Sequence, residues 1–310
     1  MAMGSTLTLV AWTVDERRAR ASFAQVYEEF DRLEMLMSVW KPGSDVLQLN
    51  AAAGERPVRV SSETLEALKI AREVSEWTEG TFDITFGALT DVWKFDHDQD
   101  DSVPTPAQIL ERLPLIGYRS LRIDEQAGTA FLLRKGMRAH LGGIAKGYAV
   151  DRAVKVLRDH GIRDFMVKAG GDLYVGGQRG DRSWKLGIAD PRAADGPPFA
   201  TVELRDRTLS TSGDYERFFM KDGIRYHHIL DLRTGQPARA TRSVTLVTRR
   251  AVLADALAKG VFILGPAQGM ALIERLPDVE GVIVSAKNEV LVSSGLRNQV
   301  TIVHPPTDSP

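Results

Sequence analysis

The sequence contains no cysteine in its 310 residues. This absence excludes disulfides, thiolate zinc sites, iron–sulfur clusters and a cysteine nucleophile. Long apolar runs are missing as well, and the run Val261-Phe262-Ile263-Leu264 falls far short of the roughly 20 residues of a membrane helix. We therefore predict no transmembrane segment, and no export signal is visible ahead of the first strand-like stretch, Leu7 to Trp12.

Charge of one sign is not in excess either. Forty basic and 41 acidic residues give a formal net charge of −1. This balance provides no global positive field for nucleic acid or anionic lipid, so we expect no nucleic-acid partner, and any anionic ligand must be held by local groups. With 43% hydrophobic and 26% charged residues, the composition is that of a globular protein with a sizeable core.

Apolar spacing predicts a series of helices and short strands. Between residues 165 and 247, and again after 281, glycine-punctuated β-type runs predict strands that are mostly antiparallel neighbours. Helices are expected where apolar residues recur every three or four positions, which is the case over 15–36, 61–78, 145–157, 251–262 and 267–276.

This order of elements predicts an α+β fold, with helices packed on mixed or antiparallel sheets. We expect a single domain over residues 1–304, with room for two intertwined lobes. The last residues, 305–310, are predicted to form a frayed tail.

The densest candidate segment is His140 to Leu157, in which two glycines separate an apolar strand-like stretch from a helix. Gly142 and Gly143 would let backbone N–H groups and the positive end of the helix approach an anion closely. Lys146 falls in the first helical turn, where its charge opposes the helix dipole unless an anion faces it. The alternative is a tight turn with a solvated lysine. A P-loop is excluded because Gly147-Tyr148 follows the lysine.

Two further candidates carry charged or titratable side chains. Asp255 lies in an apolar, alanine-rich helix window with Lys259 one turn later. The two form either an ordinary i,i+4 ion pair or, with Asp255 pointing inward, part of an oxygen site for a hard cation such as Mg²⁺. His227 and His228 fall on opposite faces of a predicted strand, so both cannot bind one metal ion.

Two more segments are a predicted turn between strands, Ala169 to Leu173, and a predicted helix-to-strand transition, Thr78 to Asp83. Neither indicates a function by itself.

Taken together and in order, however, the motifs of the chain resemble those of the ApbE family of flavin transferases. The matching stretches cover nearly the whole chain and are MSVWKPGSDVLQLN (37–50), EGTFDITFGALTDVWKF (79–95), HLGGIAKGYAVD (140–151), AGGDL (169–173), WKLGIADP (184–191), LSTSGDYERFF (209–219), YHHILDLRTGQPA (226–238), and SVTLV (243–247) with ADALAKGVFILG (254–265).

The resemblance implies an ApbE-like fold and a Mg²⁺-dependent enzyme that splits the diphosphate of FAD, releases AMP and leaves FMN as a phosphoester on a threonine of an acceptor protein. The acceptor it implies is a flavin-bearing subunit of a membrane electron-transfer complex, and the location it implies is the periplasm. Two alternatives stay open. The chain could be a metal-dependent FAD pyrophosphatase that yields FMN and AMP, or a non-catalytic FAD-binding protein.

Position by position, the resemblance also assigns roles. His228 matches the histidine that helps to deprotonate the acceptor threonine, a task that suits an imidazole. Asp255, counted as catalytic, and the carbonyl of Gly143 match the metal ligands. The positions that match FAD contacts are Met37, Thr81, Phe82, Asp83, Lys146 and Ile229.

The chain departs from the family pattern at four positions. His140 stands in place of Asp, Lys168 in place of Asn, Ala88 in place of Pro and Lys259 in place of Thr. The loss of an acidic residue and of a hydroxyl lowers the number of oxygens around the expected metal. We therefore hypothesise that the ammonium group of Lys259 replaces part of the metal centre, because an ammonium group can neutralise phosphate charge.

Overall fold

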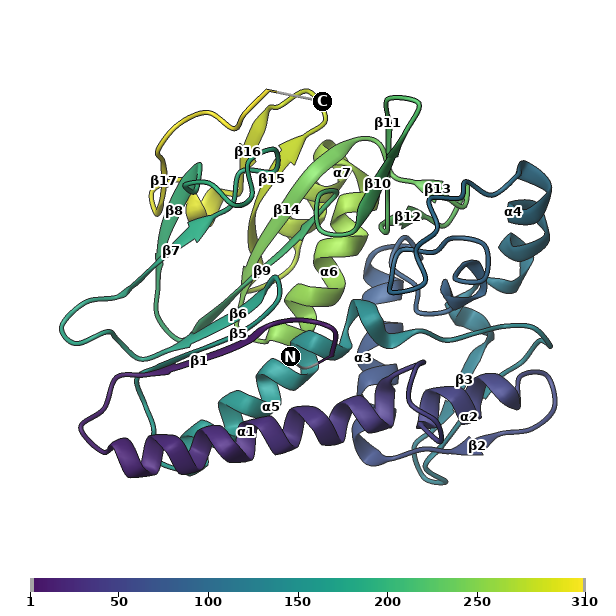
Figure 1. The fold of residues 1–310 in the computed structure, drawn as a ribbon, viewed down its shortest axis with the longest axis horizontal. Coiled ribbons are helices and arrows are strands. Elements are labelled where there is room, and N and C mark those ends of the chain that lie inside the picture. Colours follow the sequence, from purple (N-terminus) through teal and green to yellow (C-terminus); the bar gives the residue numbers. More distant parts are fainter. Residues whose placement is uncertain (1–2, 309–310) are drawn as a thin grey trace.

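A seven-stranded antiparallel sheet forms the centre of the computed structural model, which describes residues 3–308 (Figure 1). Its strand order is β1-β5-β6-β9-β14-β15-β16, and every neighbouring pair is antiparallel. The strands are β1 (Leu7–Ala11), β5 (Phe165–Ala169), β6 (Asp172–Gly176), β9 (Arg207–Gly213), β14 (Thr241–Thr248), β15 (Glu280–Ser285) and β16 (Val290–Val292).

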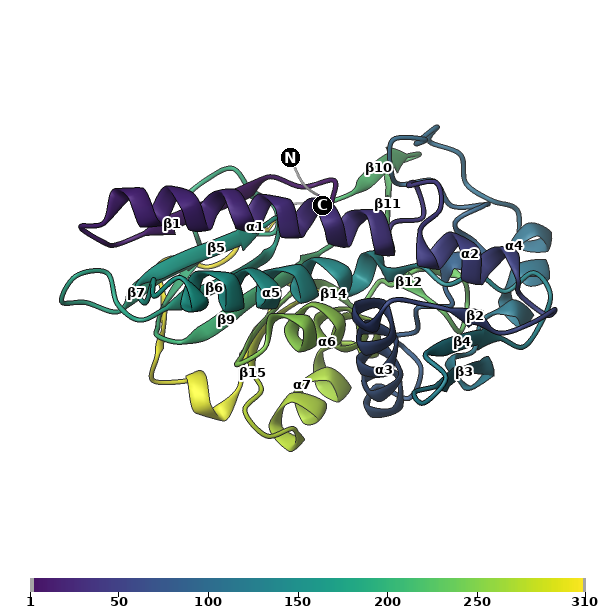
Figure 2. The ribbon, with the colours of Figure 1, turned by 90° about the horizontal axis from the view of Figure 1, so that it is seen from below.

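Helices cover one face of this sheet. Helix α6 (Ala251–Leu264) lies on β9 and β14, α5 (Ala145–Asp159) lies beside it, and α1 (Glu16–Met37) and α7 (Pro266–Arg275) flank the two (Figure 2). Helix α6 carries apolar, mostly small side chains around most of its circumference. This is expected for a helix that is buried on several sides. Helix α1 is amphipathic and starts where the Asp15 side chain accepts a hydrogen bond from Arg18 N–H at 2.9 Å.

A second sheet covers the opposite face. Side chains alternate between the two faces, so Tyr174 and Ile283 point to the helices while Leu173 and Val282 point to the second core. That core is closed by a three-stranded sheet in the order β17-β8-β7, with β7 (Trp184–Ile188), β8 (Ala200–Leu204) and β17 (Val300–Ile302).

The remaining elements form a lobe at the other end of the molecule (Figure 1). It holds the small sheet β2-β4-β3 and two hairpins, and its helix α3 contacts α6. The largest buried apolar cluster, from Leu7 to Ile283, includes residues of both lobes. The elements are α2 (Asp45–Ala51), β2 (Val58–Arg59), α3 (Ser62–Trp77), α4 (Pro106–Arg112), β3 (Leu121–Asp124), β4 (Thr129–Leu132), β10 (Phe218–Lys221), β11 (Ile224–His227), β12 (Leu230–Asp231) and β13 (Gln236–Pro237).

The predicted α+β class is confirmed, and two local expectations are wrong. No strand precedes the glycines before α5, because the chain bends there into a 3₁₀ turn, Leu141–Gly143, in which Gly142 N–H donates to His140 Nδ1 at 2.9 Å. No strand follows Thr78 to Asp83 either. The Asp83 carboxylate accepts a hydrogen bond from Thr85 N–H at 2.8 Å and turns the chain toward a further 3₁₀ turn, Gly87–Leu89.

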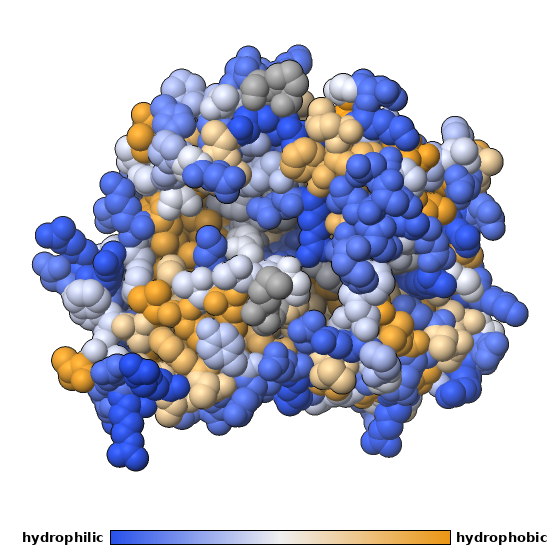
Figure 3. Space-filling view, viewed as in Figure 1, coloured by the Kyte–Doolittle hydropathy of each residue, from blue (hydrophilic) through white to orange (hydrophobic). Residues whose placement is uncertain are grey.

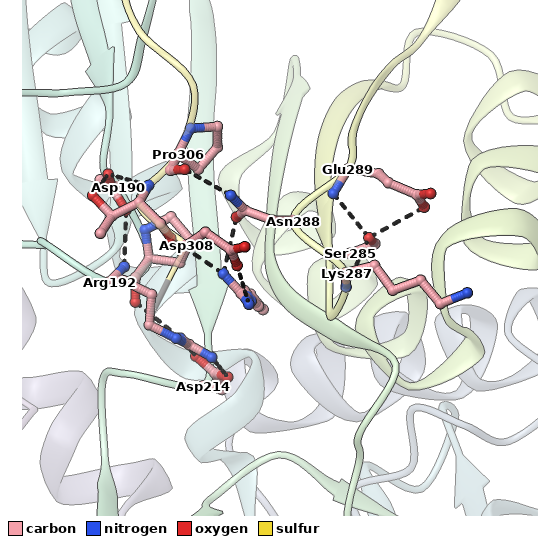
Figure 4. Close-up of polar contacts among 12 residues, drawn as sticks. Asp190, Arg192, Asp214, Ser285, Lys287, Asn288, Glu289, Pro306 and Asp308 are labelled. Carbon is pink, nitrogen blue, oxygen red and sulfur yellow. Dashed lines mark hydrogen bonds and ion pairs between the residues drawn. The ribbon is translucent and has the colours of Figure 1, made fainter. Parts of the chain in front are cut away.

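The C-terminal segment was predicted to be frayed over 305–310, and its described part is held by hydrogen bonds (Figure 4). Thr307 N–H and Oγ1 donate to Asp190 Oδ2 at 2.8 and 2.7 Å. Asn288 Nδ2 donates to the carbonyl of Pro306 at 2.6 Å, and Arg242 pairs with Asp308 at 3.1 Å. Residues 306–308 are therefore attached to the sheet, and 309–310 lie outside the described residues.

The surface is mixed in polarity. In the view of Figure 3, apolar side chains gather over β1 and α1, and polar side chains cover much of the rest. The exposed apolar residues of α1 and of the segment between β1 and α1 include Trp12, Val14 and Tyr27. Among the described residues, no helix has the length and apolar character needed to span a membrane.

Candidate active site

Lys146 and the buried Asp172 form an ion pair where α5 begins. Lys146 lies in the first turn of α5, and its Nζ is 3.7 Å from Asp172 Oδ2. Asp172 is the first residue of β6, directly after the hairpin turn at Gly170-Gly171, and it also accepts a hydrogen bond from Ser210 Oγ. The hairpin predicted at AGGDL thus carries a carboxylate to the lysine of a different element.

Asp255 joins α6 to the same helix end. Its Oδ2 accepts a hydrogen bond from Gly147 N–H at 2.9 Å. A Cβ at Gly147 would lie 2.4 Å from the carbonyl oxygen of Ala251 and 2.7 Å from Cβ of Asp255, so only glycine permits this approach of the two helices. Asp255 is therefore inward-pointing, as one of the two sequence interpretations required.

Lys259 pairs with Asp255 from the next turn of α6. Its Nζ donates to the main-chain carbonyl of Asp255 at 2.8 Å and also to Oδ1 of the same residue. The Asp255 side chain is 1% exposed and that of Lys259 is 18% exposed. Unlike an ordinary surface pair, this ion pair is withdrawn from solvent.

Gly143 and the segment that contains Thr81 and Phe82 pack against this pair. A Cβ at Gly143 would lie 3.1 Å from Cδ of Lys259 and 3.3 Å from Cε2 of Phe82. Thr81 Oγ1 donates to the carbonyl of Gly260 at 3.1 Å, which ties the same segment to α6. The structure therefore brings the predicted residues Thr81, Phe82 and Gly143 together with the Asp255–Lys259 pair.

Asp83 follows Phe82 in the chain, but its carboxylate accepts hydrogen bonds from Thr85 and Tyr118. Oδ1 accepts from Thr85 N–H and from Thr85 Oγ1, and Oδ2 accepts from Tyr118 N–H at 2.5 Å. Burial raises the pKa of Asp83 despite these hydrogen bonds. The assigned FAD contact of Asp83 stays a prediction, and the observed role is to fix the turn after Phe82.

His228 follows β11 and carries its proton on Nδ1. Its main-chain N–H donates to the carbonyl of Arg217 at 3.1 Å, and Nδ1 lies 3.3 Å from the same oxygen. A carbonyl oxygen can only accept, so this hydrogen bond places the imidazole lone pair on Nε2. Ile229, the next residue, is buried and accepts a hydrogen bond from Ala238 N–H at 3.0 Å.

The electrostatics of the site link these groups. Burial lowers the pKa of Lys146, but the carboxylates of Asp255 and Asp172 outweigh it and raise that pKa above its usual value. Burial, followed by the like charge of Asp255, raises the pKa of Asp172. The site therefore keeps a charged lysine between two carboxylates.

The two histidines at the site are driven toward the neutral form. Burial lowers the pKa of His228 well below its usual value, and His227, Arg217 and Lys259 lower it further. Burial also lowers the pKa of His140, which feels the charges of Asp96, Arg217 and Lys146. At neutral pH the His228 imidazole is thus neutral and able to accept a proton.

The predicted metal ligands do not form an open cation site. Both side-chain oxygens of Asp255 and its main-chain carbonyl already accept hydrogen bonds from Lys259 or Gly147. Within residues 3–308, no three His, Asp or Glu side chains converge as a metal site requires. A divalent ion at Asp255 would have to displace the ammonium group, so these residues as arranged do not fit Mg²⁺.

Met37 is the last residue of α1, and its side chain is buried. It belongs to the same buried apolar cluster as Phe82 and Ile229, two other residues predicted to contact FAD.

Sequence reasoning missed Asp172 and Arg217 as site residues. Asp172 was interpreted as part of a turn. The signal that would have found it is the adjacent Gly170-Gly171, because a Cβ at Gly171 would lie 2.5 Å from the Thr211 carbonyl oxygen, and a Cβ at Gly170 would lie 3.7 Å from Cε of Lys146. Arg217 was not singled out. It pairs with Asp96, and its carbonyl orients His228, contacts that depend on chain segments far apart in the sequence.

Two surface hollows lie elsewhere on the molecule. One of about 260 Å³ lies along α5 and is lined by residues such as Tyr148, Asp151 and Arg250. The other, of about 660 Å³, lies along β3 and β4. Neither of these two hollows is lined by the residues of the two lysine–aspartate pairs.

The fold and the site define an α+β protein that gathers cationic groups, a helix N-terminus and a neutral imidazole around a buried position. Residues 3–283 match the model of the ApbE family. The chain belongs to the ApbE family.

Relatives and solved structures agree with this assignment. The chain is 34% identical to the FAD:protein FMN transferase of Treponema pallidum (strain Nichols) over 91% of this chain and 82% of that protein. It is 31% identical to a protein of the same name from Klebsiella pneumoniae (strain 342), over 95% and 90% of the two chains. The ApbE protein of Thermotoga maritima superposes with a TM-score of 0.89 at 31% identity, covering 96% of this chain and 97% of that one. The flavin transferase ApbE of Vibrio cholerae superposes with a TM-score of 0.87 at 27% identity, with the same coverage.

Proposed function

We propose that this protein is an FAD:protein FMN transferase, which moves FMN from FAD to a threonine of an acceptor protein and releases AMP. The relatives that bear this name cover most of the chain and establish the family. The observation that carries the proposal for this chain is Lys146 in the first turn of α5, 3.7 Å from Asp172 and facing Asp255, with the neutral imidazole of His228 close enough to feel the charge of Lys259.

In the proposed reaction, the threonine hydroxyl oxygen of the acceptor attacks the FMN phosphorus of FAD. The bond from that phosphorus to the bridging oxygen breaks, and AMP leaves with this oxygen. His228 accepts the threonine proton on Nε2, the nitrogen that the Arg217 carbonyl leaves with its lone pair. Phosphoryl transfer depends mainly on positioning and on charge stabilisation, which Lys146 and the backbone N–H groups of α5 supply.

The resemblance implies Mg²⁺ dependence and metal-ligand roles for Gly143 and Asp255, but the hydrogen bonding of Asp255 argues against a metal ion there. We assign no step to Mg²⁺, because the oxygens of Asp255 already accept hydrogen bonds from Lys259 and Gly147. The FAD contacts assigned to Met37, Thr81, Phe82, Asp83 and Ile229 stay predictions.

We also propose, on the resemblance alone, that the acceptor is a flavin-bearing subunit of a membrane electron-transfer complex and that transfer takes place in the periplasm. Fractionation of the source cells, with detection of this chain and of flavin-labelled proteins, tests both. Recovery of the chain and of its flavin-labelled acceptor from different compartments would contradict them.

Mass spectrometry tests the activity directly. A candidate acceptor domain is incubated with FAD and the protein, with and without Mg²⁺, and the expected result is a gain of one FMN on the acceptor. An acceptor whose target threonine is replaced by valine is the matched control and should gain nothing. Free FMN and AMP without an adduct would indicate a pyrophosphatase, and intact FAD would indicate a binding protein. Either result contradicts the proposal.

A further inference from the structure

We propose that the ammonium group of Lys259 is a built-in cation that takes the place of a divalent metal ion at Asp255. In this arrangement the diphosphate of FAD is neutralised by Lys146 and Lys259 from the protein itself. The inference rests on the proposed FMN transfer for the role of the diphosphate, but its prediction about metal binding is independent of any transfer.

The first support is the hydrogen bonding of Asp255. Lys259 Nζ is bound to two oxygens of that residue, Oδ1 and the main-chain carbonyl, the latter at 2.8 Å. The third oxygen, Oδ2, is held by Gly147 N–H at 2.9 Å. A hard cation needs such oxygens as ligands, and here an ammonium group from the same helix already uses them.

The second support is burial, which distinguishes this pair from an ordinary one. Lys155 and Asp159 on α5 have the same i,i+4 spacing, but their side chains are 64% and 61% exposed. The side chains of Lys259 and Asp255 are 18% and 1% exposed. The Lys259 stem passes over Gly143, where any Cβ would lie 3.1 Å from Cδ, so the absence of a side chain there leaves space for the lysine.

The third support is the balance of charge around the pair. Lys146 faces Asp172 and Asp255 and also feels Arg217 and Glu216. His228 feels the charges of Arg217 and Lys259. Each of the two lysines is matched by a carboxylate, Lys146 by Asp172 and Lys259 by Asp255. An additional divalent ion would therefore meet no unpaired carboxylate in these two pairs, and the two lysine charges would oppose its entry.

Metal binding tests the inference without any turnover. Mn²⁺ is titrated into the protein, with and without FAD, and free Mn²⁺ is followed by electron paramagnetic resonance. We expect the wild type to leave the free Mn²⁺ signal the same as in the matching solution without protein. Lys259→Thr should bind one Mn²⁺ per chain. Asp255→Asn in the Lys259→Thr background should abolish this binding. Lys155→Thr, at the exposed pair, is the matched control and should behave as the wild type.

A second variant guards against misfolding. Lys259→Met keeps the stem over Gly143 but removes the charge, so Asp255 becomes free to bind Mn²⁺. Uptake of one Mn²⁺ by the wild type that is lost in Asp255→Asn would overturn the inference. So would the absence of Mn²⁺ binding in both Lys259→Thr and Lys259→Met when circular dichroism shows that they are folded.

FMN transfer in the presence of EDTA gives a second readout. EDTA should change wild-type transfer by less than about twofold and lower that of Lys259→Thr by about tenfold or more, with recovery on addition of Mg²⁺. A wild-type loss of that size in EDTA would also overturn the inference. If no acceptor gains FMN under any condition, the proposed function fails, and the Mn²⁺ titration alone decides the inference.

Discussion

At the residue scale, two adjacent histidines have different roles because their protons lie on different nitrogens. His227 Nε2 lies 2.8 Å from the Ala238 carbonyl and therefore donates to it, while its Nδ1 accepts from Ile229 N–H at 3.3 Å. His228 instead donates from Nδ1 to the Arg217 carbonyl. Both nitrogens of His227 are therefore used within the fold, whereas His228 retains the lone pair on Nε2 for chemistry.

We predict that His228→Asn lowers kcat for FMN transfer by roughly a hundredfold or more while KM for FAD changes little, because a general base is lost and diphosphate binding is kept. Because burial lowers the pKa of His228, the acid limb of the wild-type pH profile should lie below the ordinary histidine value of about 6.5. Steady-state kinetics between pH 5 and 8 measure both. His160→Asn, at the C-cap of α5, is the control, and an equal loss there would contradict the assignment.

His227 should make stability depend on pH. Burial lowers its pKa from 6.5 to about 4, so the unfolded chain takes up a proton at higher pH than the folded chain does. The contribution of His227 to stability is therefore complete above pH 6.5 and is lost as the pH falls toward 4, by about 3 kcal/mol. Denaturant unfolding at a series of pH values should show this loss in the wild type and a flatter profile in His227→Gln. Parallel profiles for the two proteins would disprove it.

At the scale of elements, α5 and α6 cap each other. Asp255 of α6 accepts from Gly147 N–H in the first turn of α5, a helix that has no N-cap side-chain hydrogen bond of its own. Asp151 of α5 accepts from Ala251 N–H at 2.7 Å and from Val252 N–H at 3.0 Å, at the start of α6. This reciprocal capping fixes the first turn of α5, and with it Lys146, against α6.

Asp151→Ala should therefore lower the free energy of unfolding at pH 7 by about 1 kcal/mol. The reason is that two N–H groups at the start of α6 lose their acceptor. Burial raises the pKa of Asp151 to about 6, which limits the benefit of the ionised form and keeps the expected loss moderate. Equilibrium denaturation measures the difference. Asp159→Ala, at the exposed end of the same helix, should change stability by less than about 0.5 kcal/mol, and an equal effect of both variants would argue against the capping role.

The helices were predictable because their signals are local. Helix α1 has a capping aspartate and an apolar stripe, and α5 ends near Gly161 as expected. Strand β10 and its pairing with β11 were missed, although Asp222 and Gly223, both with positive φ, form the turn signal that the sequence carries. The small sheet β2-β4-β3 has strands of two to four residues, too short for a clear alternation.

At the scale of the whole molecule, the site could be predicted only in part because its contacts join distant segments. Lys146 and Asp255 were identified as residues of interest, but their common neighbourhood depends on how α5, α6 and the β5–β6 hairpin pack together. The His228 orientation depends on Arg217, which in turn pairs with Asp96 in the loop after the 3₁₀ turn Gly87–Leu89. Such pairings carry no sequence periodicity, so residue patterns alone cannot specify them.

The segment that leads to Arg217 is anchored by a buried ion pair. Arg192 Nη1 and Nη2 donate to the two carboxylate oxygens of Asp214 at 2.7 and 2.8 Å, and their side chains are 7% and 8% exposed. Asp214 N–H donates to the Arg242 carbonyl at 3.0 Å, next to the C-terminal residues (Figure 4). The tail, the sheet and the segment that orients His228 thus form one connected network.

We predict that Asp214→Ala lowers the free energy of unfolding by about 3 to 5 kcal/mol, because it removes a carboxylate from a buried guanidinium group. The double variant Arg192→Met/Asp214→Leu should be less destabilised than the single variant, since it removes both charges together. Urea unfolding of the three proteins at pH 7 gives the comparison. A single variant as stable as the wild type would show that the pair does not hold this segment, and a double variant that is the less stable of the two would show that desolvated charge is not the cause of the loss.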